Sequence, residues 1–197
     1  MRTARSRDRY RRPLKNSMIA LFTAGCATLA VTSCSGASDT PKASPTPSAA
    51  QPTKSADLTE TAKKEAIAAY QAYWNEVEKL YADRTGKSAK LKQYAASAAL
   101  KNAEQDAKRA HGRGLLLTGH VTVKDPTVTK VVTHGKLDYA VISSCLDISK
   151  WKTVKADTKK PVTLPSDRLT KYVIQSTVER WPEGWRVTRD EPQDRRC

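Results

Sequence analysis

The first strong pattern along the chain is helical and lies between residues 57 and 84. Asp57 and Glu60 have the spacing of a capping box at a helix start, and Gly86 is placed to end the helix. Between them, apolar side chains recur at steps of three and four, the spacing of one helix face: Ile67, Tyr70, Trp74, Val77, Leu80 and Tyr81. The pattern predicts one long amphipathic helix with a single apolar stripe to bury.

A second helical region follows, from about residue 91 to Gly112 and Gly114. Charged residues leave one side of it solvated, and alanines form the face that permits close packing. These alanines are Ala95, Ala98, Ala99, Ala103, Ala107 and Ala110. We expect this region to break near residues 95 to 97.

After Gly114 the apolar spacing changes to period two and β-branched residues become frequent, which predicts strands. The predicted strands span residues 115–123, 127–132, 137–147, 172–181 and 185–189. His134-Gly135-Lys136 and Pro182-Glu183-Gly184 are predicted turns between neighbouring strands. Residues 149–168 form a looser insert, in which residues 151–154 and 161–164 could pair as a short hairpin.

These elements together predict an α+β domain with the helices packed on one face of a curved antiparallel sheet, because short turns join consecutive strands and the helices precede them. Trp74 is expected to be the most enclosed residue of the core. The helix stripe should pack on alternating strand positions: Leu137, Tyr139, Val141 and Ser143 in one strand, and Tyr172 and Ile174 in another.

The start of the chain has the composition of an export signal. Residues 2–15 carry seven cations against one acid, and the uncharged run 17–38 follows. The apolar core of this run, residues 18–31, is shorter than the roughly 20 residues that a helix needs to cross a bilayer, and no cationic stop-transfer flank follows it. We therefore expect the segment to be removed.

The run Val31-Thr32-Ser33-Cys34 resembles the lipobox of bacterial lipoproteins. The resemblance implies cleavage between Ser33 and Cys34 and a diacylglyceryl thioether on Cys34, whose two acyl chains suffice for stable anchoring. Alternatives are lipidation of Cys26, which lacks the aliphatic residue three positions earlier, and an ordinary secretory signal with an incidental cysteine. Arg11-Arg12 leaves open whether export follows the general or the twin-arginine route.

Composition divides the remainder into a linker and one domain. In residues 35–55, 17 of 21 residues are Ser, Thr, Pro, Ala or Gly, so residues 34–55 are predicted to be a lipidated cysteine followed by a disordered tether. Residues 56–197 have the usual size of one domain. They carry 26 Lys and Arg against 18 Asp and Glu, which gives a net charge of +8.

This net positive charge and the export signal limit which partners are plausible. An exported protein rarely meets nucleic acid, so anionic lipids or anionic wall polymers are the plausible electrostatic partners, beside the membrane itself and an unidentified protein of the envelope. A solvated basic surface without a partner is an equally good interpretation, because the cations are scattered. The expected location is the outer face of the cell membrane, attached by lipid.

The order of elements resembles the nuclear-transport-factor-2-like superfamily, the cystatin-like α+β cone. The resemblance rests on a long first helix, a broken second helix and late strands that read YAVISSCLD (139–147) and GWRV (184–187). With the lipobox, the polar linker and the terminal cysteine, the chain resembles small lipoproteins of Gram-positive bacteria assigned to that superfamily. Because its members include isomerases, dehydratases, binding modules and scaffolds, this resemblance does not choose a function.

Cys145 and Cys197 are the two cysteines of the predicted domain, and export places them in an oxidising compartment. We expect them to form a disulfide. Two free thiols are the alternative.

Candidates for catalysis are few. The three histidines, His111, His120 and His134, have no metal-binding spacing, and no nucleotide-binding or nucleophile-elbow motif occurs, so no metal or cofactor is predicted. Enzymes of the superfamily place an acid or base inside the cone. The residues that could fill this role or line such a pocket are Tyr70, Trp74, Tyr94, His120, Asp138 and Asp147, and no motif assigns a role to any of them.

Three functions remain, in this order: a non-catalytic interaction or scaffold domain, a small-ligand-binding module that uses the cone as a pocket, and an isomerase- or dehydratase-type enzyme. The interior of the domain discriminates between them. A cavity filled by Trp74 and its neighbours would favour the first, and an apolar cavity without titratable groups the second. An open apolar cavity with a buried carboxylate would favour the third.

Overall fold

The computed structural model describes residues 54–197, with side chains from residue 57 onward. The predicted export signal, the predicted lipid acceptor Cys34 and most of the predicted linker lie outside these residues. In the described part, no helix combines the length and apolar character needed to cross a membrane.

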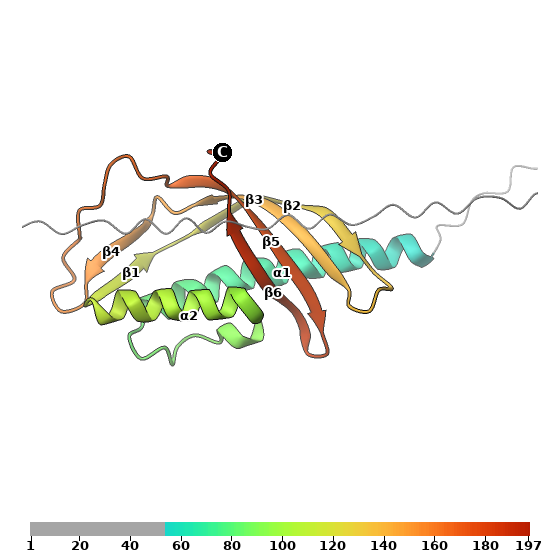
Figure 1. Ribbon diagram of the computed structural model, residues 1–197, viewed down its shortest axis with the longest axis horizontal. Coiled ribbons are helices and arrows are strands. Elements are labelled where there is room, and N and C mark those ends of the chain that lie inside the picture. Colours follow the sequence, from blue (N-terminus) through green and yellow to red (C-terminus); the bar gives the residue numbers. More distant parts are fainter. Residues whose placement is uncertain (1–53) are drawn as a thin grey trace, which may run out of the picture. The chain divides into compact units, whose positions relative to one another are not determined.

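A long helix, α1 (Lys54–Ala82), opens the domain and passes across one face of the larger sheet (Figure 1). It confirms the predicted amphipathic helix. It begins three residues earlier than predicted, so Asp57 lies in its first turn and does not cap it. Glu60 pairs instead with Lys63, with 2.7 Å between Oε1 and Nζ. The face that α1 buries consists of Ala62, Ala66, Tyr70, Tyr73, Trp74 and Val77.

The second helical region is broken as predicted. A single 3₁₀ turn (Leu91–Gln93) precedes α2 (Ser97–Gly112). The segment between them is extended and is held by two backbone hydrogen bonds to the last strand, in which Ala96 N donates to Val187 O and Val187 N donates to Tyr94 O. The buried side of α2 consists of Ala99, Ala103, Ala107 and Ala110, whose small side chains allow close packing.

The strands of the described part form two open antiparallel sheets. The smaller sheet pairs β1 (Leu115–Gly119) with β4 (Trp151–Lys155). The larger sheet has four strands in the order β2 (Thr122–Val132), β3 (Tyr139–Asp147), β5 (Lys171–Trp181) and β6 (Gly184–Pro192). The α+β class and the packing of helices on antiparallel sheets are thereby confirmed.

The strand predicted at residues 115–123 is two strands that belong to different sheets. Gly119 ends β1 with φ +98°, a conformation that favours glycine. A Cβ at this position would also collide with the carbonyl oxygen of Lys150, which precedes β4. The chain therefore turns at Gly119 and enters the larger sheet at Thr122.

The insert contains part of the predicted short hairpin. An antiparallel bridge joins Val154 to Pro161, and beside it Val162 N donates to Thr153 O and Lys155 N donates to Lys160 O. β4 also pairs with β1 along its whole length, from Gly119 opposite Trp151 to Leu115 opposite Lys155. Both predicted turns of the larger sheet, at residues 134–136 and 182–184, do join antiparallel neighbours.

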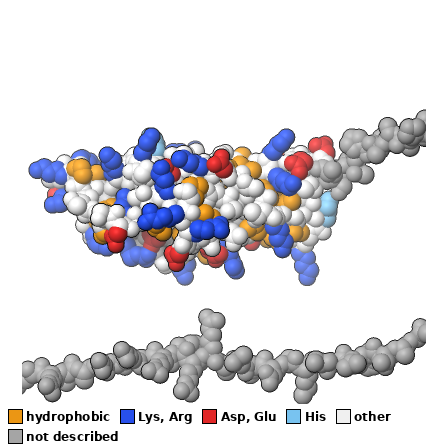
Figure 2. Space-filling view, turned by 90° about the horizontal axis from the view of Figure 1, so that it is seen from above, with side chains coloured by type: hydrophobic (Ala, Val, Ile, Leu, Met, Phe, Trp, Pro, Cys, Tyr) orange, Lys and Arg blue, Asp and Glu red, His pale blue; other side chains and the backbone are white. Residues whose placement is uncertain are grey.

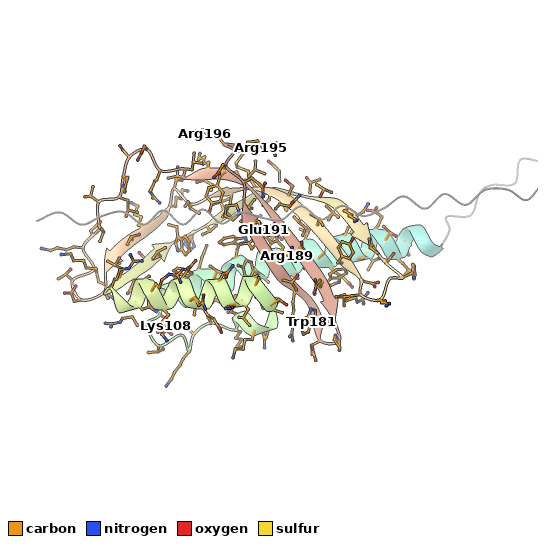
Figure 3. The ribbon with its side chains drawn as sticks, viewed as in Figure 1. Lys108, Trp181, Arg189, Glu191, Arg195 and Arg196 are labelled. Atoms are coloured by element: carbon orange, nitrogen blue, oxygen red, sulfur yellow. A yellow bond between two sulfur atoms is a disulfide. The ribbon has the colours of Figure 1, made fainter. Side chains whose placement is uncertain are left out.

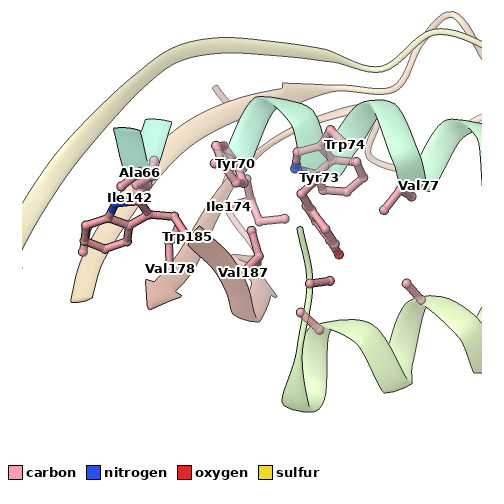
Figure 4. Packing of buried hydrophobic residues seen from close by; sticks show 14 of the residues in the cluster. Ala66, Tyr70, Tyr73, Trp74, Val77, Ile142, Ile174, Val178, Trp185 and Val187 are labelled. Carbon is pink, nitrogen blue, oxygen red and sulfur yellow. The ribbon is translucent and has the colours of Figure 1, made fainter. Parts of the chain in front are cut away.

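The core lies between α1 and the larger sheet, where the buried residues of the helix face those of β3, β5 and β6 (Figure 4). In β5 the inward positions include Ile174, as predicted. In β3 the predicted phase is wrong: Leu137, Tyr139, Val141 and Ser143 do not form the buried face. The buried residues of β3 are Ala140, Ile142, Ser144 and Leu146.

The enclosure of single residues also differs from the prediction. Trp74 is buried, with 8% of its surface exposed, but Tyr70 has 0% exposed and is the more enclosed of the two. The Tyr70 hydroxyl is 2.9 Å from the Ser144 hydroxyl. This hydrogen bond between α1 and β3 satisfies two polar groups that the fold buries.

A disulfide joins Cys145 of β3 to Cys197, with 5.8 Å between their Cα atoms. The predicted pair is therefore present. Beyond β6, the backbone runs back beside β5, where Gln193 N donates to Val173 O and Val173 N donates to Arg195 O. The bridge fixes this last segment to the centre of the sheet.

Candidate functional site

A pocket of about 390 Å³ lies between α1, α2, β4, β5 and β6. It is lined by Tyr73, Trp74, Val77, Tyr81, Ala99, Asn102, Ala103, Asp106, Arg109, Trp151, Tyr172, Ile174, Asp190 and Pro192. The small alanines of α2 leave this space beside the larger side chains of α1. A hollow of comparable volume, beside Leu80, Gly86 and His111, is lined by helix ends and loop residues and contains no buried carboxylate.

Aromatic side chains form much of the pocket wall. Tyr73 and Trp74 of α1 meet edge to face, with 5.4 Å between ring centroids. Tyr81 and Trp151 form a second edge-to-face pair at 5.0 Å, which joins α1 to β4. Tyr172 of β5 is the fifth aromatic residue of the lining. Figure 4 shows the ring of Tyr73 reaching from α1 toward α2.

A bulge in β6 directs Asp190 to the pocket. Thr177 pairs with Arg189 whereas Val178 pairs with Val187, so Thr188 is an extra residue in β6. One extra residue reverses the alternation of side chains that follow it. Val187 faces the core before the bulge, and Asp190 lines the pocket after it.

The carboxylate of Asp190 has two hydrogen-bond donors. The Ser176 hydroxyl donates to Oδ1 at 2.6 Å, and the Tyr73 hydroxyl donates to Oδ2 at 3.4 Å. The pKa of Asp190 is raised to about 6, mainly by burial and to a smaller extent by the charge of Glu191, while the hydrogen bonds from Ser176 and Tyr73 act in the opposite direction. Asp190 is therefore a carboxylate that changes charge just below neutral pH.

The neighbouring tyrosines stay neutral over the same pH range. Burial raises the pKa of Tyr70 to about 12 and that of Tyr73 well above 10, and the charge of Asp190 adds to both effects. The Tyr73 hydroxyl therefore serves as a hydrogen-bond donor to Asp190, and a change of charge in the wall of the pocket is confined to the carboxylate.

The rim of the pocket on α2 is polar. Asp106 and Arg109 lie one turn apart on the helix and form an ion pair whose members are both well exposed. Asn102, a turn earlier, is also exposed. Because exposed pairs contribute little free energy, this pair matters mainly because each charge neutralises the other at the pocket mouth.

Two indole N–H groups of the lining residues have no hydrogen-bond partner among residues 54–197: Trp74 Nε1 and Trp151 Nε1. An unpaired buried donor costs about 1–3 kcal/mol. Both nitrogens are fully buried, so neither donor is open to the pocket.

The structure separates the residues predicted to line a pocket. Trp74 lines the pocket described above, whereas Tyr70 is buried behind it against Ser144. Tyr94 lines a shallow hollow on the far side of α1, together with Trp185. Asp138 lies at the β2–β3 turn, where its carboxylate accepts a hydrogen bond from the backbone N–H of His134 at 2.9 Å.

Asp147 and His120, the other acid–base candidates, have structural partners outside the pocket. Hydrogen bonds from the hydroxyl and backbone N–H of Ser149 hold the pKa of Asp147 well below its usual range. His120 Nδ1 is 3.3 Å from a carboxylate oxygen of Glu78. In the described part of the chain, no three His, Cys, Asp or Glu side chains gather as a metal site would require.

Glu76 is a buried carboxylate with a structural role, whereas Asp190 is only partly buried. Burial alone would raise the pKa of Glu76, but the Lys79 ammonium and the backbone N–H of Lys90 bind it at 2.6 and 2.5 Å and hold the pKa below the usual value. Glu76 thus ties α1 to the segment before the 3₁₀ turn. Asp190 differs because it lines a pocket and receives no charged donor.

Sequence reasoning missed Asp190 as a site residue. Alternation counted from Trp185 and Val187 would place Arg189 and Glu191 inward. The local sequence gives no signal of the bulge at Thr188. Trp151 and Tyr172 were also missed, because residues on β4 and β5 meet only when the two sheets come together around α1.

Positive charge is dispersed on the face of the domain that Figure 2 shows, where lysine and arginine side chains are spread along the domain with acidic side chains among them. In Figure 3, Lys108 projects from α2, whereas Arg195 and Arg196 lie together near the C-terminal end.

Comparisons with known proteins add little to this description. No protein-family model matches the chain, and no curated protein matches it. A similar solved structure is the intermembrane space region of the chloroplast protein ARC6, with a TM-score of 0.40 and 15% sequence identity, covering 64% of this chain and 95% of that chain. Similarity at this level supports no statement about family or function.

Proposed function

We propose that the protein is a lipid-anchored protein of the cell envelope whose α+β domain binds a small ligand in the pocket between α1 and α2. The observation that carries this proposal is the open pocket of about 390 Å³ beside Trp74. A volume in this range, with five aromatic and five aliphatic residues and four polar or charged ones in the lining, is typical of ligand sites. An open pocket favours a ligand-dependent function over the scaffold domain, which would have a filled interior, and the carboxylate of Asp190 keeps an enzyme as the second candidate.

The anchoring part of the proposal rests on the sequence. The lipobox-like run that ends at Cys34 and the polar tether after it would hold the domain at the extracytoplasmic face of the membrane. The proposal includes a nuclear-transport-factor-2-like origin for the domain, in which the space between helices and bent sheet is the cone. The order of elements and the bulges in β2 and β6 support this origin.

A pocket-blocking variant tests the binding function. In Asn102→Trp, an exposed residue of the rim is replaced by a large side chain that can cover the pocket without entering the core. The matched control is Gln105→Trp, which places the same side chain on an exposed position of α2 outside the lining. The full-length chain in detergent is screened by thermal shift against small cations, anions and neutral molecules.

We expect ligands that raise the melting temperature of the wild type and of Gln105→Trp, with affinity for Asn102→Trp at least tenfold weaker. Ligands that bind both tryptophan variants equally would place the site elsewhere. A screen without any ligand sensitive to Asn102→Trp would contradict the proposed function.

A proton-transfer enzyme is the second candidate, favoured by the carboxylate of Asp190 with its raised pKa. The ligands from the screen discriminate between the two functions. An enzyme would convert its ligand during incubation, as followed by NMR, and Asp190→Asn would abolish the conversion. A binding module would return the ligand unchanged.

A further inference from the structure

We infer that the ligand of this pocket is a small organic cation whose ammonium group lies among the aromatic rings beside Asp190. The inference rests on the proposed function and specifies the class of ligand. Three observations carry it: the charge of the lining, the aromatic composition of the wall, and the position of the carboxylate.

The pocket is acidic although the domain is basic. Residues 56–197 have a net charge of +8 and 26 cationic side chains, but the lining contains only one of these cations, Arg109. Arg109 is paired with Asp106 at the rim. Asp190 therefore gives the lining a net charge of −1, which attracts a cation and repels an anion at short range.

The aromatic wall matches the same ligand. Five aromatic residues line the pocket: Tyr73, Trp74, Tyr81, Trp151 and Tyr172. The faces of such rings attract a cation, most strongly when water is excluded, and aromatic cages are a general means of binding quaternary ammonium groups. An edge-to-face arrangement, found in both aromatic pairs, holds neighbouring rings at a steep angle to each other and so can surround a rounded group.

The neighbours of Asp190 leave its charge available. From α1 it faces Tyr73 and Tyr70, which stay neutral, and from β5 it faces Ser176 and Tyr172, which are also uncharged at neutral pH. Glu191, next to it on β6, adds negative charge. Among the charged residues of the lining, the remaining ones are the paired Asp106 and Arg109 on α2. Among residues 57–197, no cationic side chain donates a hydrogen bond to Asp190.

The test compares three probes of nearly equal shape and different charge: choline, the neutral 3,3-dimethyl-1-butanol and the anionic 3,3-dimethylbutyrate. Binding to the full-length chain in detergent is measured by calorimetry and by fluorescence, since Trp74 and Trp151 line the pocket. At pH 7.5 we expect choline to bind at least about tenfold more tightly than the alcohol. The carboxylate probe should not bind measurably.

Variants at two neighbouring residues assign the effect to Asp190. Asp190→Asn keeps the shape and removes the charge, and it should abolish the preference for choline over the alcohol. Glu191→Gln removes a charge of the same sign from an exposed neighbour outside the lining and should preserve the preference. The choline affinity of the wild type should fall several-fold between pH 7.5 and pH 5, because Asp190 becomes neutral, and Asp190→Asn should lack this pH dependence.

If the alcohol binds as tightly as choline, or if Asp190→Asn retains the preference, the ligand class is wrong, although the pocket still binds small molecules. If choline does not bind at all, or binds Asn102→Trp as well as wild type, the inference is likewise overturned. The proposed function is decided separately by the screen for ligands that the Asn102→Trp variant loses.

Discussion

Asp190 connects the stability of the domain to the chemistry of its pocket. A carboxylate placed among aromatic rings with only hydroxyl donors is less well solvated than in water, and this burial raises its pKa to about 6 from an ordinary value of 3.8. The folded state therefore retains a proton that the unfolded state loses. Ionising Asp190 costs free energy in this poorly solvated position, and a bound cation would offset that cost.

The pH dependence of folding tests this description. Between pH 3.8 and about 6 the folded state binds more protons at Asp190 than the unfolded state does, so the contribution of this group to stability decreases as pH rises through that window. The decrease should amount to at most about 3 kcal/mol and should end above pH 6. It is measured as the free energy of unfolding in urea from pH 4 to pH 7.

Carboxylates such as Asp83 and Asp147 have lowered pKa values, so their contribution to stability increases as pH rises, at lower pH than that of Asp190 changes. A comparison of variants separates the contribution of Asp190 from theirs. Asp190→Asn should remove the decrease between pH 4 and 6. Glu191→Gln should retain it. A wild type and an Asp190→Asn variant with parallel pH profiles would show that Asp190 is not buried as described.

Strand β6 and the segment after it determine both the site and the closure of the fold. The bulge at Thr188 directs Asp190 inward, and the backbone beyond β6 pairs with Val173 of β5 before the chain ends at Cys197. The disulfide to Cys145 fixes this end to β3, two strands away from β6 in the sheet order. The position of the pocket wall thus depends on a link between the chain end and the sheet centre.

Removing the disulfide should destabilise the domain. The bridge closes a loop across 52 positions of sequence, for which chain entropy gives a stabilisation of about 4 kcal/mol. We expect reduction, or the double variant Cys145→Ser/Cys197→Ser, to lower the free energy of unfolding by up to this amount. Hydrogen exchange of the amides at Val173 and Gln193 should increase.

The double variant also supplies the control, because its stability should not change when a reductant is added. Labelling of both cysteines by a thiol reagent in the native, oxidised wild type would contradict the bridge.

For the molecule as a whole, the sequence predicts an anchor and the structure describes a domain. The tether predicted for residues 34–55 would hold this domain near the membrane. Positive charge spread over the domain, as in Figure 2, would add a general attraction to an anionic surface that weakens with salt. The anchor itself should come from acyl chains.

Replacement of the acceptor cysteine tests the anchor. Cys34→Ala should abolish acylation, slow removal of the signal and release the protein from the detergent phase on partitioning, because the hydrophobic contribution of the two acyl chains is lost. Intact-mass analysis of the membrane fraction measures the lipid directly. Cys26→Ala is the matched control and should keep the wild-type mass shift. Lipid on Cys26, or wild-type protein without lipid, would refute the assignment.

The helices, most strands and the cysteine pair could be predicted from sequence, because these depend on local periodicity, on turn residues and on the number of cysteines. The sequence also supplied the whole argument for anchoring. The long helix with Tyr70 and Trp74 and the strand with Ile174 could be predicted for this reason. The phase of β3 could not, since Tyr139 and Val141 on its outer face are as apolar as Ala140 and Ile142 on its inner face.

The position of the pocket and the residues that line it depend on the tertiary fold. Trp151 and Tyr172 become neighbours because Gly119 turns β1 into a second sheet that places β4 beside α1. Asp190 faces the pocket because one extra residue at Thr188 reverses the alternation of β6. Both features depend on how distant strands pair. This pairing is decided by the packing free energy of the whole sheet, which no local sequence pattern reports.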